Sequence, residues 1–146
     1  MAVLIDYPDV GVEPANLAEQ KRIGLRPYAS MYKAESLINW RTDVIGGHSQ
    51  LTLAVLEEVR LIPEDEFTSK PKTFWRVLDL LNGAYRQRVF TNVDKGVEQV
   101  GVDKFPQLKG QPMSAIPLVV CGVTGEVADI EPPPLIDLCE ANLEHY

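Results

Sequence analysis

Acidic side chains are the residues of this sequence that could carry out chemistry if the fold brought them together. Asp6, Asp43, Glu57 and Asp79 fall in or beside segments expected to be strands. Carboxylates that converge from different strands can hold the divalent metal ions of a nuclease-like hydrolase. Acids at strand ends also form solvated rims that discourage edge pairing, which is the simpler interpretation. A metal-dependent hydrolase that uses Asp6, Asp43 or Asp79 is therefore one hypothesis, placed behind structural roles for these acids.

Arginine and aromatic residues interleave on both sides of Asn82-Gly83. The set comprises Phe74, Trp75, Arg76, Tyr85, Arg86 and Arg88. Aromatic rings and basic groups on one face could stack on and hold a nucleic acid. Side chains alternate between the two faces of a strand, so buried aromatic rings and exposed arginines explain the same pattern more simply.

Other motifs of catalysis or ligand binding are weak. Gly46-Gly47-His48-Ser49 holds a base and a hydroxyl, but a glycine pair between two strands is first a hairpin turn. The segment Gly122-Val123-Thr124-Gly125 lacks the lysine of a phosphate-binding loop. Cys121, Cys139, His48 and His145 do not have the spacing of zinc ligands. We expect both cysteines to be free, buried thiols. The sequence predicts that the protein is not an enzyme and has no catalytic residue, cofactor or metal.

The composition is that of a soluble globular domain. Of 146 residues, 45% are hydrophobic and 24% are charged, which excludes a disordered chain, a collagen-like repeat and a coiled coil. Lys and Arg number 14 and Asp and Glu 21, giving a net charge of −7. A free-standing nucleic-acid binder is disfavoured, because attraction to phosphates supplies most non-specific affinity. No apolar run reaches the roughly 18 residues that span a bilayer, so we expect no membrane partner and a cytoplasmic or virion location.

Short strands separated by tight turns are expected over most of the chain, which has 11 prolines and 10 glycines. Gly46-Gly47 and Asn82-Gly83 are predicted hairpin turns, the second of type I′. Residues 63–72 are predicted to form a polar loop, and 105–112 an irregular segment. Leu51, Leu53, Val55 and Val59 are expected on one face of their strand. The predicted strands are 2–7, 27–33, 38–44, 50–61, 73–81, 84–91, 97–102 and 116–121.

Two helices complete the expected fold. Acids precede bases in 13–22, with Gly24 closing that helix, and Pro134 starts a terminal helix over 134–146. The predicted class is α+β: a mostly antiparallel β-sheet with hairpins, one early short helix and one C-terminal helix, in a single domain over 1–146. Both ends look cut from something longer. We expect Trp40 to anchor the sheet core and Gly83 to adopt a positive φ.

Several blocks of this sequence together resemble a tailed-phage and prophage family that is usually regarded as portal-like and formally has no known function. Their order and spacing match over nearly the whole chain, although no single block is a catalytic signature. The blocks are Ala2-Val3-Leu4-Ile5-Asp6-Tyr7-Pro8, Leu25-Arg26-Pro27-Tyr28, Tyr32, Glu35-Ser36-Leu37-Ile38-Asn39-Trp40-Arg41, Ile116-Pro117-Leu118-Val119, Pro133-Pro134-Leu135-Ile136-Asp137-Leu138 and Asn142-Leu143-Glu144-His145-Tyr146.

The resemblance implies a structural role in the virion, and in the host cytoplasm during assembly. Portal proteins are longer, so the chain would be an internal slice: the β-rich wing region, with the helix 134–146 leading toward a missing stem. The parent protein would form a ring, usually of twelve subunits, at one capsid vertex. Double-stranded DNA would pass through it non-specifically during packaging and ejection, and the implied partners are other portal subunits, capsid, terminase and connector proteins.

Two alternatives to the portal role stay open. One is a free-standing phage or bacterial adaptor that docks a partner through the arginine and aromatic hairpin, and the other is a decayed prophage remnant. An adaptor would be a stable monomer or dimer, whereas a portal slice would expose apolar surface and tend to associate.

Overall fold

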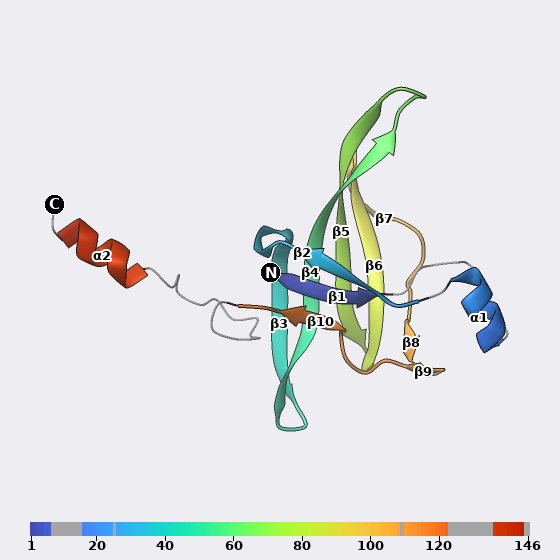
Figure 1. The fold of residues 1–146 in the computed structure, drawn as a ribbon, viewed down its shortest axis with the longest axis horizontal. Coiled ribbons are helices and arrows are strands. Elements are labelled where there is room, and N and C mark those ends of the chain that lie inside the picture. Colours follow the sequence, from blue (N-terminus) through green and yellow to red (C-terminus); the bar gives the residue numbers. More distant parts are fainter. Residues whose placement is uncertain (7–15, 25, 109, 123–135, 145–146) are drawn as a thin grey trace.

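Antiparallel sheets dominate the computed structural model, which describes residues 1–6, 16–24, 26–108, 110–122 and 136–144 (Figure 1). The largest sheet has the order β3-β4-β5-β6-β7, from Leu37–Ile45, His48–Pro63, Ser69–Leu81, Ala84–Val93 and Gly96–Gln99. A three-stranded sheet has the order β10-β1-β2, from Leu118–Val120, Ala2–Asp6 and Tyr28–Tyr32. Two short strands, β8 and β9, pair separately over Gln107–Leu108 and Gln111–Pro112.

Both predicted hairpin turns are confirmed. Asn82 and Gly83 have φ values of 52° and 79°, the positive pair that a type I′ turn requires, and they join β5 to β6. Gly46 and Gly47 have φ values of 61° and 83° and join β3 to β4. These turns match the right-handed twist of the strands and therefore set the register of the large sheet.

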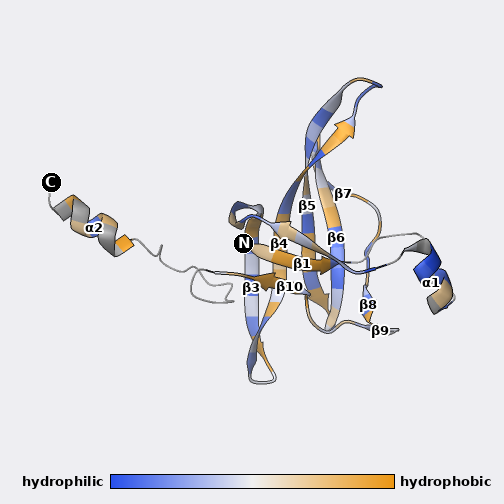
Figure 2. Cartoon of the chain, viewed as in Figure 1, coloured by the Kyte–Doolittle hydropathy of each residue, from blue (hydrophilic) through white to orange (hydrophobic). Residues whose placement is uncertain are grey.

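The core lies between the two larger sheets. Figure 1 shows β1, β2 and β10 running across the strands of the large sheet, and Figure 2 shows that β1 and β10 are largely hydrophobic. Leu4 of β1, Leu56 of β4 and Leu78 of β5 are fully buried there. The whole buried cluster consists of Ala2, Leu4, Ala54, Leu56, Leu78, Tyr85, Ile116 and Leu118.

Two predictions about the core need correction. The register between β3 and β4 shifts between Arg41 and Thr42, so Thr52 is an extra residue in β4 and the alternation changes there. Leu51 consequently packs against the core cluster and does not follow the parity of Leu53 and Val55. Trp40 does not anchor the core: it is only half-buried, beside the small Ala54, and lies outside the buried cluster.

The helices are short. The first α-helix, α1, covers Leu17–Ile23; Asn16 caps it by accepting a hydrogen bond from the backbone N–H of Glu19 at 2.9 Å. Gly24, with φ 73°, closes it as expected. A 3₁₀ turn, η1, covers Ala34–Ser36, and the second α-helix, α2, covers Ile136–Glu144. Pro134, the predicted start of the terminal helix, lies outside the described residues. Among the described residues no helix has the length and apolar character to cross a membrane.

The α+β class is wrong, because the chain is essentially all-β. An α+β fold needs helices that cover a sheet. Figure 1 instead shows α1 and α2 apart from the sheets, and no described helical side chain belongs to the buried cluster. The fold is held together by packing one sheet on another.

The hairpin of β4 and β5 is longer than predicted. Strand β4 continues to Pro63 and β5 begins at Ser69, so half of the expected polar loop is paired strand. The neighbouring strand β3 pairs with β4 only as far as Leu56, and β6 pairs with β5 only as far as Phe74. Beyond these residues the hairpin is a two-stranded ribbon, which we call the arm (residues 59–73). Figure 1 shows the arm projecting from the body of the protein.

Candidate functional site

The acids that could have formed a metal site are dispersed. Asp6 and Asp79 lie on different sheets and are paired with different arginines, Asp43 accepts a hydrogen bond from Thr52 at 2.6 Å, and Glu57 is exposed. Among the residues that the structure describes, no group of three His, Cys, Asp or Glu side chains is arranged to hold a metal ion. The described residues therefore give no geometric support to the metal-site hypothesis, which the sequence analysis had placed behind structural roles for these acids.

The arginine and aromatic residues of the β5–β6 hairpin are divided between the two faces of the sheet. Phe74, Arg76 and Tyr85 are on the face that meets the small sheet. Trp75, Arg86 and Arg88 are on the other face, as the pairing of Trp75 with Phe90 and of Asp79 with Arg86 requires. The arginines are not the exposed groups that the sequence suggested, because each of them is paired with carboxylates.

A polar network closes one end of the core and joins the two sheets. Arg76 of β5 donates to Asp6 of β1 at 2.5 Å and to Glu58 of β4 at 2.7 Å. The Tyr32 hydroxyl of β2 also donates to Glu58, at 2.7 Å. Arg60 also donates a hydrogen bond to the Glu58 carboxylate, at 2.5 Å. Four strands of two sheets are thus fixed to one another by charge-assisted hydrogen bonds.

Burial and hydrogen bonding shift the pKa values of the side chains in and beside this network. Burial opposes ionisation of Glu58, but hydrogen bonds from Arg60 and Tyr32 and the charge of Arg76 outweigh it, so its pKa is below the usual range. Burial and the hydrogen bond to Glu58 raise the pKa of Tyr32. Burial also raises the pKa of Tyr85, whose oxygen accepts a hydrogen bond from Gln87 at 2.6 Å. All three groups keep one protonation state near neutral pH, which suits a structural role better than proton transfer.

A second cluster lies on the opposite face of the large sheet. Asp79 accepts hydrogen bonds from Arg86 and Arg88, each at 2.7 Å, and Arg86 also reaches Asp103 at 3.0 Å. The hydrogen bonds from Arg86 hold the pKa of Asp79 below its usual range. Arg88 also lies 5.5 Å from the ring centre of Phe90. The arginines are held by acids of their own chain, which weakens this face as a site for nucleic-acid phosphates.

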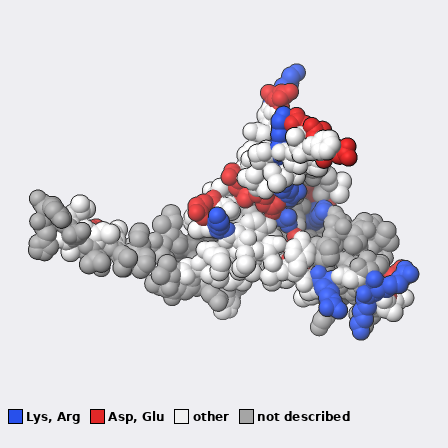
Figure 3. Space-filling model, turned by 45° about the horizontal axis from the view of Figure 1, so that its top comes forward, with Lys and Arg blue, Asp and Glu red and all other residues white. Residues whose placement is uncertain are grey.

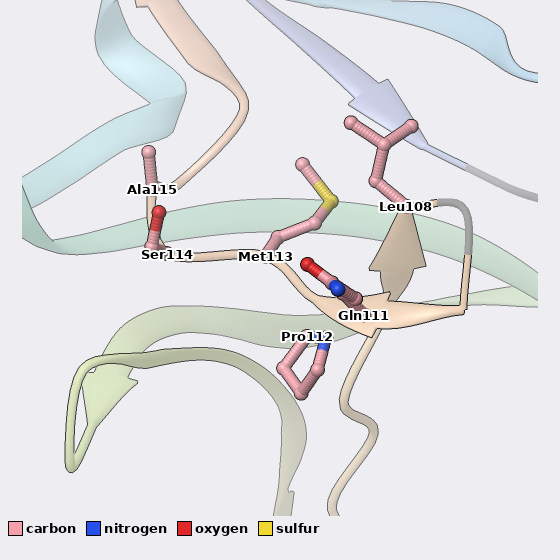
Figure 4. A pocket seen from close by; sticks show the side chains of 6 residues that line it. All are labelled: Leu108, Gln111, Pro112, Met113, Ser114 and Ala115. Atoms are coloured by element: carbon pink, nitrogen blue, oxygen red, sulfur yellow. The ribbon is translucent and has the colours of Figure 1, made fainter.

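A shallow depression of about 270 Å³ lies beside the β8–β9 hairpin. Figure 4 shows its side chains, which come from β8, β9 and the segment that follows β9. Only one hydroxyl, that of Ser114, and one amide, that of Gln111, are among them. The remaining lining residues are Leu108, Pro112, Met113 and Ala115. This set includes no charged group and no base that could activate Ser114.

The remaining motifs have simple structural roles. His48 pairs with Ile45 directly beside the Gly46-Gly47 turn, and His48 and Ser49 are exposed there. Cys121 and Cys139 are free, but the prediction that both are buried is wrong: Cys121 is half-buried and Cys139 is exposed.

The arm is the surface that the sequence did not predict. It exposes several large apolar side chains: Val59 (65% exposed), Leu61 (70%), Ile62 and Phe67 (88%). Pro63 and Pro71 had suggested a loop, since proline cannot donate to a strand ladder. The predicted strand 50–61 already contained Val59 and Leu61; what the sequence analysis missed is that residues 62–63 and 69–72 are also paired.

No protein-family model matches the sequence, and no curated protein is significantly similar to it.

Proposed function

We propose that the chain is a structural segment of a phage portal-like ring, through which DNA is packaged and ejected. The sequence blocks that resemble the portal-like family support this role, and one structural observation carries it furthest. The arm is a paired ribbon without a flanking strand among the described residues, and it exposes apolar side chains on an otherwise acidic protein. Surfaces of this kind are typical of protomers whose fold is completed by neighbours.

The charge of the chain is compatible with a conduit for DNA. The net charge is −7, and the arginines of the β5–β6 hairpin are paired with Asp6, Glu58 and Asp79. A surface of this sign repels phosphates, so DNA could slide past without sticking. In this role the chain performs no bond-making step, and its partners are other subunits, capsid, terminase and connector proteins in the virion.

Electron microscopy of the protein encoded by the whole reading frame that contains these residues tests the proposal. We expect closed rings around an open channel, and labelling of this chain at a single vertex of the phage head. Monomers or dimers without a channel, or labelling spread over the whole capsid, would contradict it.

The adaptor alternative is weaker on the same geometry. It requires the arginines and aromatic rings of the β5–β6 hairpin on one accessible face, whereas the strand alternation divides them and carboxylates neutralise the arginines.

A further inference from the structure

The arm cannot be explained by the stability of one isolated chain. A two-stranded ribbon is marginally stable in water unless a further strand or a helix covers it. Residues 59–63 pair only with 69–73 among the described strands. Their exposed apolar side chains add to the unfavourable contact with solvent. A partner that covers Leu61 and Phe67 would remove this surface from water.

Extension of the sheet is an unsuitable way to cover the arm. Pro71 and Pro63 lack the N–H groups that a new neighbouring strand would need. Lys70 and Lys72 flank Pro71, and lysines on an edge strand discourage pairing with another chain. The partner must therefore be recognised through side chains.

Two ends of the molecule carry side chains of opposite charge. The turn at the tip of the arm holds Glu64, Asp65 and Glu66; Glu64 is paired with Lys70 at 2.5 Å, and Asp65 accepts hydrogen bonds from the backbone N–H groups of Phe67 and Thr68. Lys21 and Arg22 of α1 and Arg26 lie at a different end of the molecule. Figure 3 shows Lys and Arg gathered over α1, whereas Asp and Glu lie together with Lys and Arg on the upper projection.

The α1 end also offers apolar surface. The segment from β7 to β8 passes along the same side of the molecule in Figure 1, and it exposes Val102, Phe105 and Leu108. An acidic tip with apolar flanks thus has a basic counterpart with apolar flanks on the same chain. The arm projects away from that end, so one molecule cannot bring them together.

We propose that the arm of one copy docks, head to tail, on the α1 end of a second copy of this chain. Leu61 and Phe67 pack on the apolar side chains between β7 and β8, and the acidic tip faces Lys21, Arg22 and Arg26. Because the contact joins two different surfaces, it can repeat from copy to copy. The assembly closes into a ring when the rotation that relates neighbouring copies is a whole fraction of a turn. The inference deepens the proposed portal role, although the contact itself requires no phage function.

Sedimentation velocity of the purified chain over a range of protein concentrations tests the contact. We expect wild type to associate. A Leu61→Asp/Phe67→Asp variant should have an association constant lower by about 30-fold or more, as for loss of central interface anchors. Val44→Asp is the matched control, because Val44 is 77% exposed on the other projecting hairpin. Circular dichroism should show the same β-sheet content in all three proteins.

Charge reversal distinguishes the head-to-tail contact from general stickiness. Lys21→Glu/Arg22→Glu and Glu64→Lys/Glu66→Lys should each weaken self-association, whereas a mixture of the two variants should associate, because the acidic α1 end of one is complementary to the basic tip of the other. Combining all four changes in one chain should restore association. A monomeric wild type, association of the arm variant at wild-type strength, or no restoration would overturn the inference.

Failure of this contact and failure of the portal role can be told apart. If the whole reading frame forms rings and the arm variant forms them equally well, the portal role stands and the arm inference is wrong. If the chain associates through the arm but the parent forms no channel, the reverse holds.

Discussion

Gly83 is the residue whose backbone most directly holds a hairpin. Its φ is 79°, and a Cβ built there would meet nothing within 4 Å, so a substitution affects the backbone alone. We expect Gly83→Val to lower the free energy of unfolding by about 2 kcal/mol, since a β-branched residue is strained in the left-handed region. Gly83→Asn is the control and should cost a few tenths of a kcal/mol. Urea unfolding measures both, and equal losses would show that φ is not the cause.

Arg76 is the residue on which the polar network depends. It lies between Asp6 and Glu58, and its side chain is only 16% exposed. Arg76→Met keeps most of the volume but leaves two carboxylates facing each other with little water. We expect a loss of about 3 kcal/mol in the free energy of unfolding at pH 7. Arg22→Met, on an exposed side chain of α1, is the control and should change stability by less than about 0.5 kcal/mol. An equal, small effect of both changes would contradict a stabilising network.

The pH dependence of stability should reveal Glu58. Its pKa is lower in the folded protein than the ordinary value of 4.5, so its ionised form stabilises the fold above that pH. This contribution is lost as the pH falls through the folded pKa. We expect Glu58→Gln to be less stable than wild type at pH 7 and to show a shallower decline below pH 4.5. Thermal unfolding measured between pH 3 and pH 7 tests this, with Glu66→Gln at the arm tip as the control. Parallel curves for wild type and Glu58→Gln would show that the network does not titrate.

At the scale of elements, turn chemistry was the best guide in the sequence. Asn82-Gly83 and Gly46-Gly47 located two hairpins because positive φ leaves few choices of residue. The length of the β4–β5 hairpin was missed because Pro63 and Pro71 are tolerated in a ribbon whose outer edges pair with no described strand. The class was misjudged for another reason: local signals located helices that the structure describes as α1 and α2, but such signals do not tell whether a helix packs on a sheet.

The candidate sites were misjudged because their charged residues form ion pairs with residues that are distant in the sequence or on neighbouring strands. Strand alternation could have divided Trp75 from Arg76, as the sequence analysis itself noted. No local pattern could show that Asp6 would meet Arg76, or that Asp79 would meet Arg86 and Arg88. These partners depend on how two sheets and three neighbouring strands come together, which sequence spacing alone does not encode.

The arm should be dispensable for folding of the body. Its residues contribute nothing to the buried cluster, and Arg60 pairs with Lys72 across the ribbon. We expect replacement of residues 61–71 by Asn-Gly to change the free energy of unfolding by less than about 1 kcal/mol, measured at a protein concentration low enough to keep wild type monomeric, because a tight turn closes the shortened hairpin. Near-wild-type urea unfolding would agree. A loss of cooperative unfolding would show that the arm supports the core of its own chain.

At the scale of the whole molecule, the described surface combines a net acidic charge with apolar side chains on protruding elements. Many of the apolar groups lie outside the core: Val59, Leu61 and Phe67 on the arm, Val44 on the β3–β4 hairpin, and Val102 between β7 and β8. Like charges keep copies apart at long range, whereas apolar patches hold them together at contact. Association must therefore bring an acidic region onto a basic one, which makes it directional.

Directional association should make the stability of the chain depend on its concentration. A partner that binds only the folded state raises the unfolding temperature as its concentration rises. We expect the thermal midpoint of wild type to increase over a hundredfold range of protein concentration, and that of the Leu61→Asp/Phe67→Asp variant to stay constant. Raising the salt from about 0.05 M to 0.5 M should reduce the increase, because exposed charges at the arm tip and α1 are screened. An increase unaffected by salt would assign the contact to apolar packing alone and remove the role of Lys21 and Arg22. A midpoint independent of concentration, in a protein that unfolds reversibly, would mean that the arm has no second copy to bind.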